Sequence, residues 1–181
     1  PIGFIHKCPR KLDNDSRAFN LSRMPYDHCR TMEKGNKKRS NIMPNHVTNQ
    51  ITVQFDKEED YDKFKELVVG DESQQEFDFD KIVPQPEDIN PDLNKDVNTD
   101  WYDWRCKNWG TKWNAYDIEI EWDDKYKEQI EIEFKTAWSP PEPIYFKLRK
   151  IFGEDLYINW FCRDEGDNYC GYVHNQQYVN G

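Results

Sequence analysis

The segment from residue 116 to residue 135 constrains the fold of this 181-residue chain more than any other part of it. Large hydrophobic and charged residues alternate there twice, around a polar turn at residues 123–128. The hydrophobic positions are Tyr116, Ile118, Ile120 and Trp122, then Ile130, Ile132 and Phe134; the charged positions are Asp117, Glu119 and Glu121, then Glu131, Glu133 and Lys135. Because successive side chains of a strand point to opposite faces, this spacing predicts an antiparallel hairpin with one buried and one charged face. We interpret the glutamates as a solvated sheet surface and not as paired catalytic carboxylates.

A strand and a helix are predicted before this hairpin. Residues 47–55 alternate in the same way and indicate a strand. Asp56 and Glu59 then have the spacing of a helix-capping box, and Gly70 is a stop signal. Between these signals, one helical face carries Tyr61, Phe64, Leu67 and Val68. A return strand at residues 76–83 would complete a β-α-β unit.

The region from residue 84 to residue 114 is predicted to be an insert. Pro84, Pro86 and Pro91 indicate a loop or crossing through residues 84–98. A helix is then expected from Trp101, with Thr99 or Asp100 as its N-cap, and Gly110 is expected to end it.

A helix and two strands are predicted after the hairpin. Ser139 is the expected N-cap of this helix, with Glu142 three residues later, and Gly153 closes it. Its apolar face carries Ile144, Leu148, Ile151 and Phe152. Strands follow at residues 156–160 and 169–173, joined by a turn at residues 165–168. The complete order predicts an α+β fold with helices packed on a mainly antiparallel sheet.

The insert carries the most distinctive side chains of the chain. Four of the seven tryptophans lie between Trp101 and Trp113. A turn at Gly110 would set Trp109 and Trp113 around Lys112, which is typical of a stacking or cation–π surface for nucleobases or a protein partner. The alternative is that the rings fill the gap between helix and sheet while Lys112 reaches outward. The candidate binding residues are Trp101, Arg105, Trp109, Lys112, Trp113, Trp138 and Ser139.

Four stretches carry a family resemblance. They are MPNHVTNQITV from Met43, NWGTKWNAYD at Asn108–Asp117, TAWSPPEP at Thr136–Pro143, and the turn at Glu165–Gly166. With these stretches the chain resembles the YubB-like family of phage and plasmid proteins. The resemblance implies a ferredoxin-like domain over residues 43–175, with two helices on one face of the sheet and the Trp-rich helical insert at about residues 84–114. It implies no activity, because the family has no established biochemical function. Residues 176–181 are expected to be a frayed tail.

The charge of the chain is divided unevenly. The net charge is −10, yet residues 1–42 carry 10 Lys or Arg against 4 Asp or Glu, while the rest carries 15 against 31. We predict a basic, disordered extension over residues 1–42, outside the folded domain. Two alternatives are a basic arm for a nucleic acid or acidic partner, and a natural start at Met43. The acidic body opposes binding to phosphate backbones and favours a partner with a basic surface.

Few residues suggest catalysis or metal binding. His46 and His174 are the only histidines after residue 42, and the chain contains no GxSxG, HExxH or phosphate-binding glycine loop. The five cysteines are odd in number and lack CxxC spacing, so a reduced set is expected, although Cys162 and Cys170 could face each other in one hairpin. No catalytic residue, metal or cofactor is predicted.

The sequence therefore predicts a non-enzymatic interaction module of a mobile genetic element that binds a host or element-encoded protein in the bacterial cytoplasm. RNA or single-stranded DNA binding by aromatic stacking is the first alternative, disfavoured by the acidic body, and an enzyme with a non-standard site is the second. No apolar run approaches the roughly 20 residues that span a bilayer, so no membrane association is expected. The sequence leaves the oligomeric state open.

Overall fold

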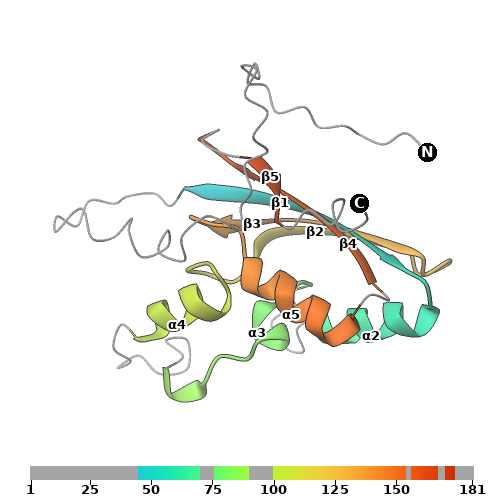
Figure 1. Cartoon of the computed structure of the whole chain (residues 1–181), viewed down its shortest axis with the longest axis horizontal. Helices are drawn as coiled ribbons and strands as arrows, with labels where there is room; N and C mark the ends of the chain where they lie inside the picture. Colours follow the sequence, from blue (N-terminus) through green and yellow to red (C-terminus); the bar gives the residue numbers. More distant parts are fainter. Residues whose placement is uncertain (1–44, 70–75, 90–99, 154–155, 167–169, 174–181) are drawn as a thin grey trace, which may run out of the picture.

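A computed structural model describes residues 45–69, 76–89, 100–153, 156–166 and 170–173. In these ranges five strands and four α-helices follow one another (Figure 1). The strands are β1 (His46–Phe55), β2 (Tyr116–Trp122), β3 (Gln129–Ala137), β4 (Leu156–Asp164) and β5 (Cys170–Tyr172). The helices are α2 (Glu58–Val68), α3 (Phe79–Ile82), α4 (Asp100–Asn108) and α5 (Glu142–Phe152), with a 3-10 turn η2 (Glu87–Ile89). The predicted α+β class is confirmed.

The strands form one sheet in the order β2-β3-β1-β4-β5, and every neighbouring pair is antiparallel. The ten-residue strand β1 lies at the centre and pairs along its length with β3 on one side and β4 on the other. The predicted hairpin is present as β2 and β3. The register brings Val47 of β1 opposite Thr136 of β3 and Asp164 of β4, so three strand ends meet at one end of the sheet.

The core lies between one face of the sheet and the helices. Figure 1 shows α2, α3 and α5 on the same side of the sheet. From β1 the odd-numbered residues Val47 to Phe55 point into this core and are buried. Aromatic contacts join the layers: the ring centroids of Phe64 and Phe152 lie 5.9 Å apart, between α2 and α5. The rings of Tyr145 on α5 and Trp160 on β4 lie 6.2 Å apart. Large rings thus supply much of the buried area that a short chain needs.

The other sheet face, here called the open face, is charged along β2 and β3. Glu119 lies directly opposite Glu133, and Glu121 directly opposite Glu131. All four side chains are exposed, as the alternation predicted. Like charges directly opposite one another across two strands are destabilising. The open face therefore holds a concentration of negative charge that the fold itself does not require.

The return strand predicted at residues 76–83 is wrong. This segment contains the short helix α3 instead, because the Asp78 carboxylate accepts a hydrogen bond from the Asp80 N–H and caps it. Asn114 locks the turn: its side-chain oxygen accepts from Phe79 N at 2.9 Å, and its Nδ2 donates to Asp78 at 2.6 Å. Phe77 and Phe79 are both fully buried. Two buried residues at this spacing are typical of a strand, but here they belong to a compact turn.

Two predicted helix caps are also wrong. The N-cap of α2 is Lys57, one residue after Asp56, and the N-cap of α5 is Pro141, two residues after Ser139. Neither N-cap side chain makes a capping hydrogen bond. Gly153 is the C-cap of α5, as predicted. The predictions for residues 1–42, Gly70, Pro91, Thr99 and the tail at 176–181 lie outside the described residues.

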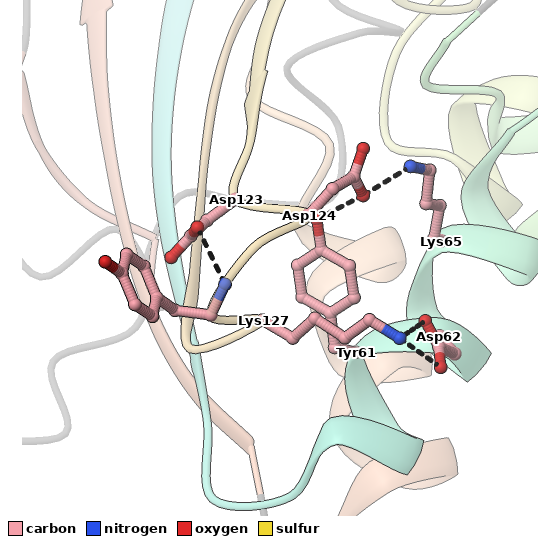
Figure 2. A network of polar contacts seen from close by, with 7 residues as sticks. Tyr61, Asp62, Lys65, Asp123, Asp124 and Lys127 are labelled. Carbon is pink, nitrogen blue, oxygen red and sulfur yellow. Dashed lines mark hydrogen bonds and ion pairs between the residues drawn. The ribbon is translucent and has the colours of Figure 1, made fainter.

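Helix α2 is fastened to the β2–β3 turn by a polar network (Figure 2). The Tyr61 hydroxyl donates to Asp124 Oδ1 at 3.0 Å, and Lys65 Nζ contacts the same oxygen at 2.7 Å. Lys127 reaches back from the turn to Asp62 at 2.8 Å. The hydrogen bonds from Lys65 and Tyr61 lower the pKa of Asp124. Burial and the bond to Asp124 raise the pKa of Tyr61 well above its ordinary value.

Replacing Tyr61 by phenylalanine is expected to lower the free energy of unfolding by about 1–2 kcal/mol at neutral pH, the usual value of a hydrogen bond to a charged group. The ring and its core contacts remain. Because the folded state holds this hydroxyl protonated, its contribution is complete below about pH 10 and declines as the unfolded tyrosine ionises above that pH. Urea unfolding of both proteins at pH 8 and pH 10.5 checks this. A difference between them that grows at the higher pH would contradict the assignment.

Candidate functional site

The two distinctive loops of the sequence, around Gly110 and around Ser139, pack directly against each other. Gly110 has a φ of +80°, and a Cβ atom built on it would lie 2.6 Å from Pro143 Cδ. Only glycine allows both the left-handed backbone and this close approach. The Ser139 hydroxyl donates to the Gly110 carbonyl at 2.5 Å. The serine therefore joins the two loops and does not cap α5.

Buried hydrogen bonds connect this junction to the centre of the sheet. Trp160 Nε1 donates to Asn49 Oδ1 at 3.1 Å, and Asn49 Nδ2 donates to Thr136 Oγ1 at 3.0 Å. Thr136 in turn donates to the Ser139 carbonyl at 2.9 Å. A second contact is made by Thr111, whose hydroxyl donates to the Ala137 carbonyl at 2.8 Å and lies 3.2 Å from the Ala137 N–H. Satisfied buried networks of this kind hold a loop in a single conformation.

Trp109 fills the space beneath the loop and is 1% exposed. Its ring packs against Phe79 at 6.1 Å and Trp104 at 5.7 Å between centroids. Its indole N–H donates to the Val83 carbonyl at 2.9 Å. Of the two interpretations left open by the sequence, core packing is the one that the structure shows for this residue.

Arg105 is also an internal residue, 8% exposed. Its guanidinium lies between two indoles, 4.9 Å from the centroid of Trp109 and 5.3 Å from that of Trp101. Its Nε donates to Gln85 Oε1 at 2.8 Å. These contacts fasten α4 to the segment before it, so the charge of Arg105 stabilises the insert from inside.

Trp113 is the exposed member of a row of otherwise partly buried aromatic and cationic side chains, which we call the Trp113 surface: Tyr102, Lys112 and Trp113 of the insert, Tyr116 of β2 and His46 of β1. Trp113 is 36% exposed, and its ring meets that of Tyr116 edge-on at 6.1 Å. The ammonium of Lys112 lies 5.7 Å from the Trp113 centroid and 5.6 Å from that of Tyr102. The predicted pairing of Lys112 with Trp113 is therefore present, without Trp109.

His46 and Tyr116 form the end of this surface. His46 Nδ1 and the Tyr116 hydroxyl are joined by a short hydrogen bond. Burial, together with the carboxylates of Asp117 and Glu165, raises the pKa of Tyr116 to about 12. The phenol is therefore held in its neutral form, hydrogen-bonded to His46. The hydrogen bond to His46 fixes the position of the Tyr116 ring, which contacts the Trp113 ring.

The predicted binding residues thus separate into two groups. Lys112 and Trp113 share one surface, and Trp101 and Trp138 are partly exposed, whereas Arg105, Trp109 and Ser139 are buried. Among the described aromatic side chains, no ring contact joins Trp138 to Trp109 or Trp113. Trp138 instead has a φ of +75° and donates its N–H to the Asn45 carbonyl at 2.8 Å.

Sequence reasoning missed the contributions of His46, Tyr102 and Tyr116 to the surface. The alternation predicts Tyr116 on the hydrophobic face, but a register shift between Tyr116 and Glu119 places it opposite Lys135, on the open face. The sequence gives one indication that His46 belongs to a site, which is that the chain contains few histidines.

The cysteines differ from expectation. Cys106 and Cys170 are disulfide-bonded, so the prediction of a fully reduced set is wrong. Cys162 is free and buried, and burial raises the pKa of its thiol to about 12. Cys162 pairs across the strands with Gly171, not with Cys170.

The described residues contain neither a candidate metal site nor a helix that could cross a membrane. Within the residues that the structure covers, His, Cys, Asp and Glu side chains form no group of three or more that could hold a metal ion. In the same parts of the chain, no helix combines the length and the apolar character needed to cross a bilayer.

Comparisons with known proteins found no similar protein. No protein-family model matches the chain, and no curated protein or solved structure matches it either.

Proposed function

We propose that this chain is a ferredoxin-like domain that binds another protein through the Trp113 surface and performs no catalysis itself. The fold proposal is supported by the element order β1-α2-β2-β3-α5-β4 together with the spatial order β2-β3-β1-β4, which is the split β-α-β arrangement. Helices α3 and α4 are then an insertion between α2 and β2. The resemblance of the loop sequences extends the proposal to a protein of a phage or plasmid.

The observation that carries the binding proposal is a large exposed indole on a rigid support. Trp113 lies close after the Gly110–Thr111 turn in the sequence, and hydrogen bonds of Ser139 and Thr111 hold the backbone of that turn. Tryptophan is enriched among the residues that dominate protein interfaces, and a side chain already held in place loses little conformational entropy on binding. Lys112 beside the ring adds a charge that favours a carboxylate of the partner at that point.

A nucleic-acid ligand is less well supported. The open face of the sheet, which many ferredoxin-like domains use for RNA, carries the opposed pairs Glu119–Glu133 and Glu121–Glu131. Phosphates would be repelled there. Exposed aromatic residues do occur on the β4–β5 half of the sheet, at Tyr157 and Tyr172, and they define where bases would stack if this alternative held.

The experiment has two stages. Tagged full-length protein is first used to recover partners from bacterial lysate, with and without nuclease, and the recovered protein is then purified and titrated calorimetrically. Replacing Trp113 by alanine is expected to weaken binding about 30-fold or more, the effect of losing a dominant interface residue. Lys112→Ala is expected to have a smaller effect, because a charge at the rim contributes less.

Tyr126→Ala is the matched control. Tyr126 is 59% exposed in the β2–β3 turn, at the end of β2 opposite to Tyr116, and its removal is expected to leave the affinity unchanged. Unaltered binding by the Trp113 variant would move the interface elsewhere. Recovery that disappears on nuclease treatment would favour the nucleic-acid alternative instead.

A further inference from the structure

The β4–β5 half of the open face carries a second group of aromatic side chains, separate from the Trp113 surface. Tyr157 and Tyr172 are 45% and 49% exposed, and the half-buried Phe161 meets Tyr172 edge-on at 5.5 Å between ring centroids. Phe161 lies directly opposite Tyr172, and Tyr157 is four residues earlier on β4, so all three belong to one face. Helices α2, α3 and α5 lie on the other side of the sheet (Figure 1). The three rings are therefore turned away from the core that these helices cover.

The strand register sets these rings beside the glutamates of the other half of the sheet. Neighbouring strands lie about 4.8 Å apart, so the two strand spacings between Phe161 on β4 and Glu133 on β3 amount to roughly 10 Å. Neutral side chains of β1 lie between them. We call this area the aromatic–acidic platform: it consists of Tyr157 and of two rows across the sheet, the first formed by Tyr172, Phe161, Gln50, Glu133 and Glu119, the second by Asn159, Thr52, Glu131 and Glu121.

Both sides of the platform attract the same kind of ligand, a cation. The faces of aromatic rings are electrostatically negative and attract guanidinium and ammonium groups. On the acidic side, Glu119 and Glu133 repel each other, and a cation between them relieves this repulsion. Gln50 Nε2 donates to Glu133 at 2.8 Å, and Gln129 Nε2 donates to Glu131 at 2.8 Å. These bonds orient the carboxylates, and each carboxylate keeps further acceptor positions for a ligand.

We propose that the aromatic–acidic platform binds an extended, arginine-rich segment of a protein, independently of the partner of the Trp113 surface. The segment lies over β1 and directs alternate side chains to the two sides, because successive side chains of an extended chain point in opposite directions. Guanidinium groups stack on the rings on one side and pair with carboxylates on the other. Arginine fits both contacts better than lysine, since its planar group stacks on aromatic faces and binds a carboxylate through two N–H groups.

Two cations mark the end of the platform toward the Trp113 surface. Thr48 of β1 lies opposite Lys135 on β3 and Arg163 on β4, so both basic side chains belong to the next row of the open face. Tyr116 lies in that row, opposite Lys135, and His46 lies two residues before Thr48. Because like charges repel, a basic segment ends before this row. Tyr116 and His46 therefore stay accessible to another partner.

The test uses a fluorescein-labelled synthetic peptide of about eight residues in which arginine alternates with threonine. It is titrated with the full chain at about 150 mM salt, where long-range attraction to the acidic protein is largely screened. Fluorescence anisotropy reports binding. Tyr157→Ala and Tyr172→Ala are each expected to weaken binding about 2- to 5-fold, the effect of losing one exposed cation–π contact. The corresponding lysine peptide is expected to bind more weakly than the arginine peptide, and the reverse order would overturn the stacking of guanidinium groups.

A pair of double variants separates the platform from net charge. Glu131→Gln with Glu133→Gln is expected to weaken peptide binding about 3- to 10-fold, the effect of losing two exposed ion pairs. Glu58→Gln with Glu59→Gln removes the same charge from exposed positions at the start of α2, on the other side of the sheet, and is expected to leave the affinity nearly unchanged. Equal losses in the two double variants would mean that the peptide responds to net charge alone, which refutes the platform.

Trp113→Ala distinguishes this inference from the proposed function. It is expected to leave the peptide affinity unchanged, while it weakens binding of the partner recovered from lysate. Loss of peptide binding in this variant would place the basic segment on the Trp113 surface and refute the platform. A thymidine oligonucleotide that binds through Tyr157 and Tyr172 would also refute it, because the rings would then serve nucleobases. All substituted side chains are exposed, and circular dichroism checks that each variant is folded.

Discussion

Replacing Trp109 by alanine is expected to destabilise the protein by about 3–5 kcal/mol, the range for removing a large aromatic side chain from a core. Trp109 is almost fully buried, packs against Phe79 and Trp104, and supports one side of the Arg105 guanidinium. Its loss leaves a cavity, an unpaired Val83 carbonyl and a buried cation with one aromatic neighbour fewer.

Equilibrium unfolding in urea, followed by circular dichroism, measures the change. Trp113→Ala is the matched control: it removes the same ring four residues later, from a side chain that is 36% exposed, and is expected to cost under half as much. Equal losses in the two variants would show that Trp109 is not the internal support described above.

The Gly110→Ala substitution is expected to cost about 3 kcal/mol or more, for two reasons that add. Alanine is strained at a φ of +80°, and its Cβ would lie 2.6 Å from Pro143 Cδ and 3.3 Å from the Glu142 nitrogen. The Pro143 ring sits at the start of α5 and cannot rotate away. The loop must therefore shift, and the Ser139–Gly110 hydrogen bond lengthens with it.

Gly153→Ala separates the two contributions. Gly153 also has a positive φ, +65°, but a Cβ atom built there meets nothing within 4 Å. It therefore reports backbone strain alone. Thermal unfolding of both variants is expected to show the lower midpoint for Gly110→Ala. The reverse order would mean that the approach of the two loops is not as close as the structure shows.

The alternation of hydrophobic and polar residues predicted the strands well, because each strand of this sheet has one buried and one exposed face. The hairpin, the central strand, α5 and the Gly153 stop all follow from periods of 2 or 3.6 residues and one glycine. The failures have a common cause in side-chain hydrogen bonds between distant segments. Asp78 caps α3 only because Asn114, far along the chain, holds the turn. Ser139 has the spacing of a cap, yet its hydroxyl is taken by the Gly110 carbonyl.

The candidate site was predictable as a region but not residue by residue. The density of tryptophan located it, and the Lys112–Trp113 pair follows from adjacency in the sequence. Which indole lies inside depends on how α4 sits against α3, and no local pattern in the sequence contains that packing. His46 enters the site through the strand register, a long-range property.

The two outer strands of the described sheet are poor templates for further pairing. An exposed strand edge offers unpaired N–H and C=O groups to another chain, and native proteins blunt such edges by charge, irregularity or shortness. Strand β2 has an irregular register between Tyr116 and Glu119, a positive φ at Asp117, and outward glutamates. Strand β5 has three residues. Copies of this domain are therefore protected against growing edge to edge into fibrils.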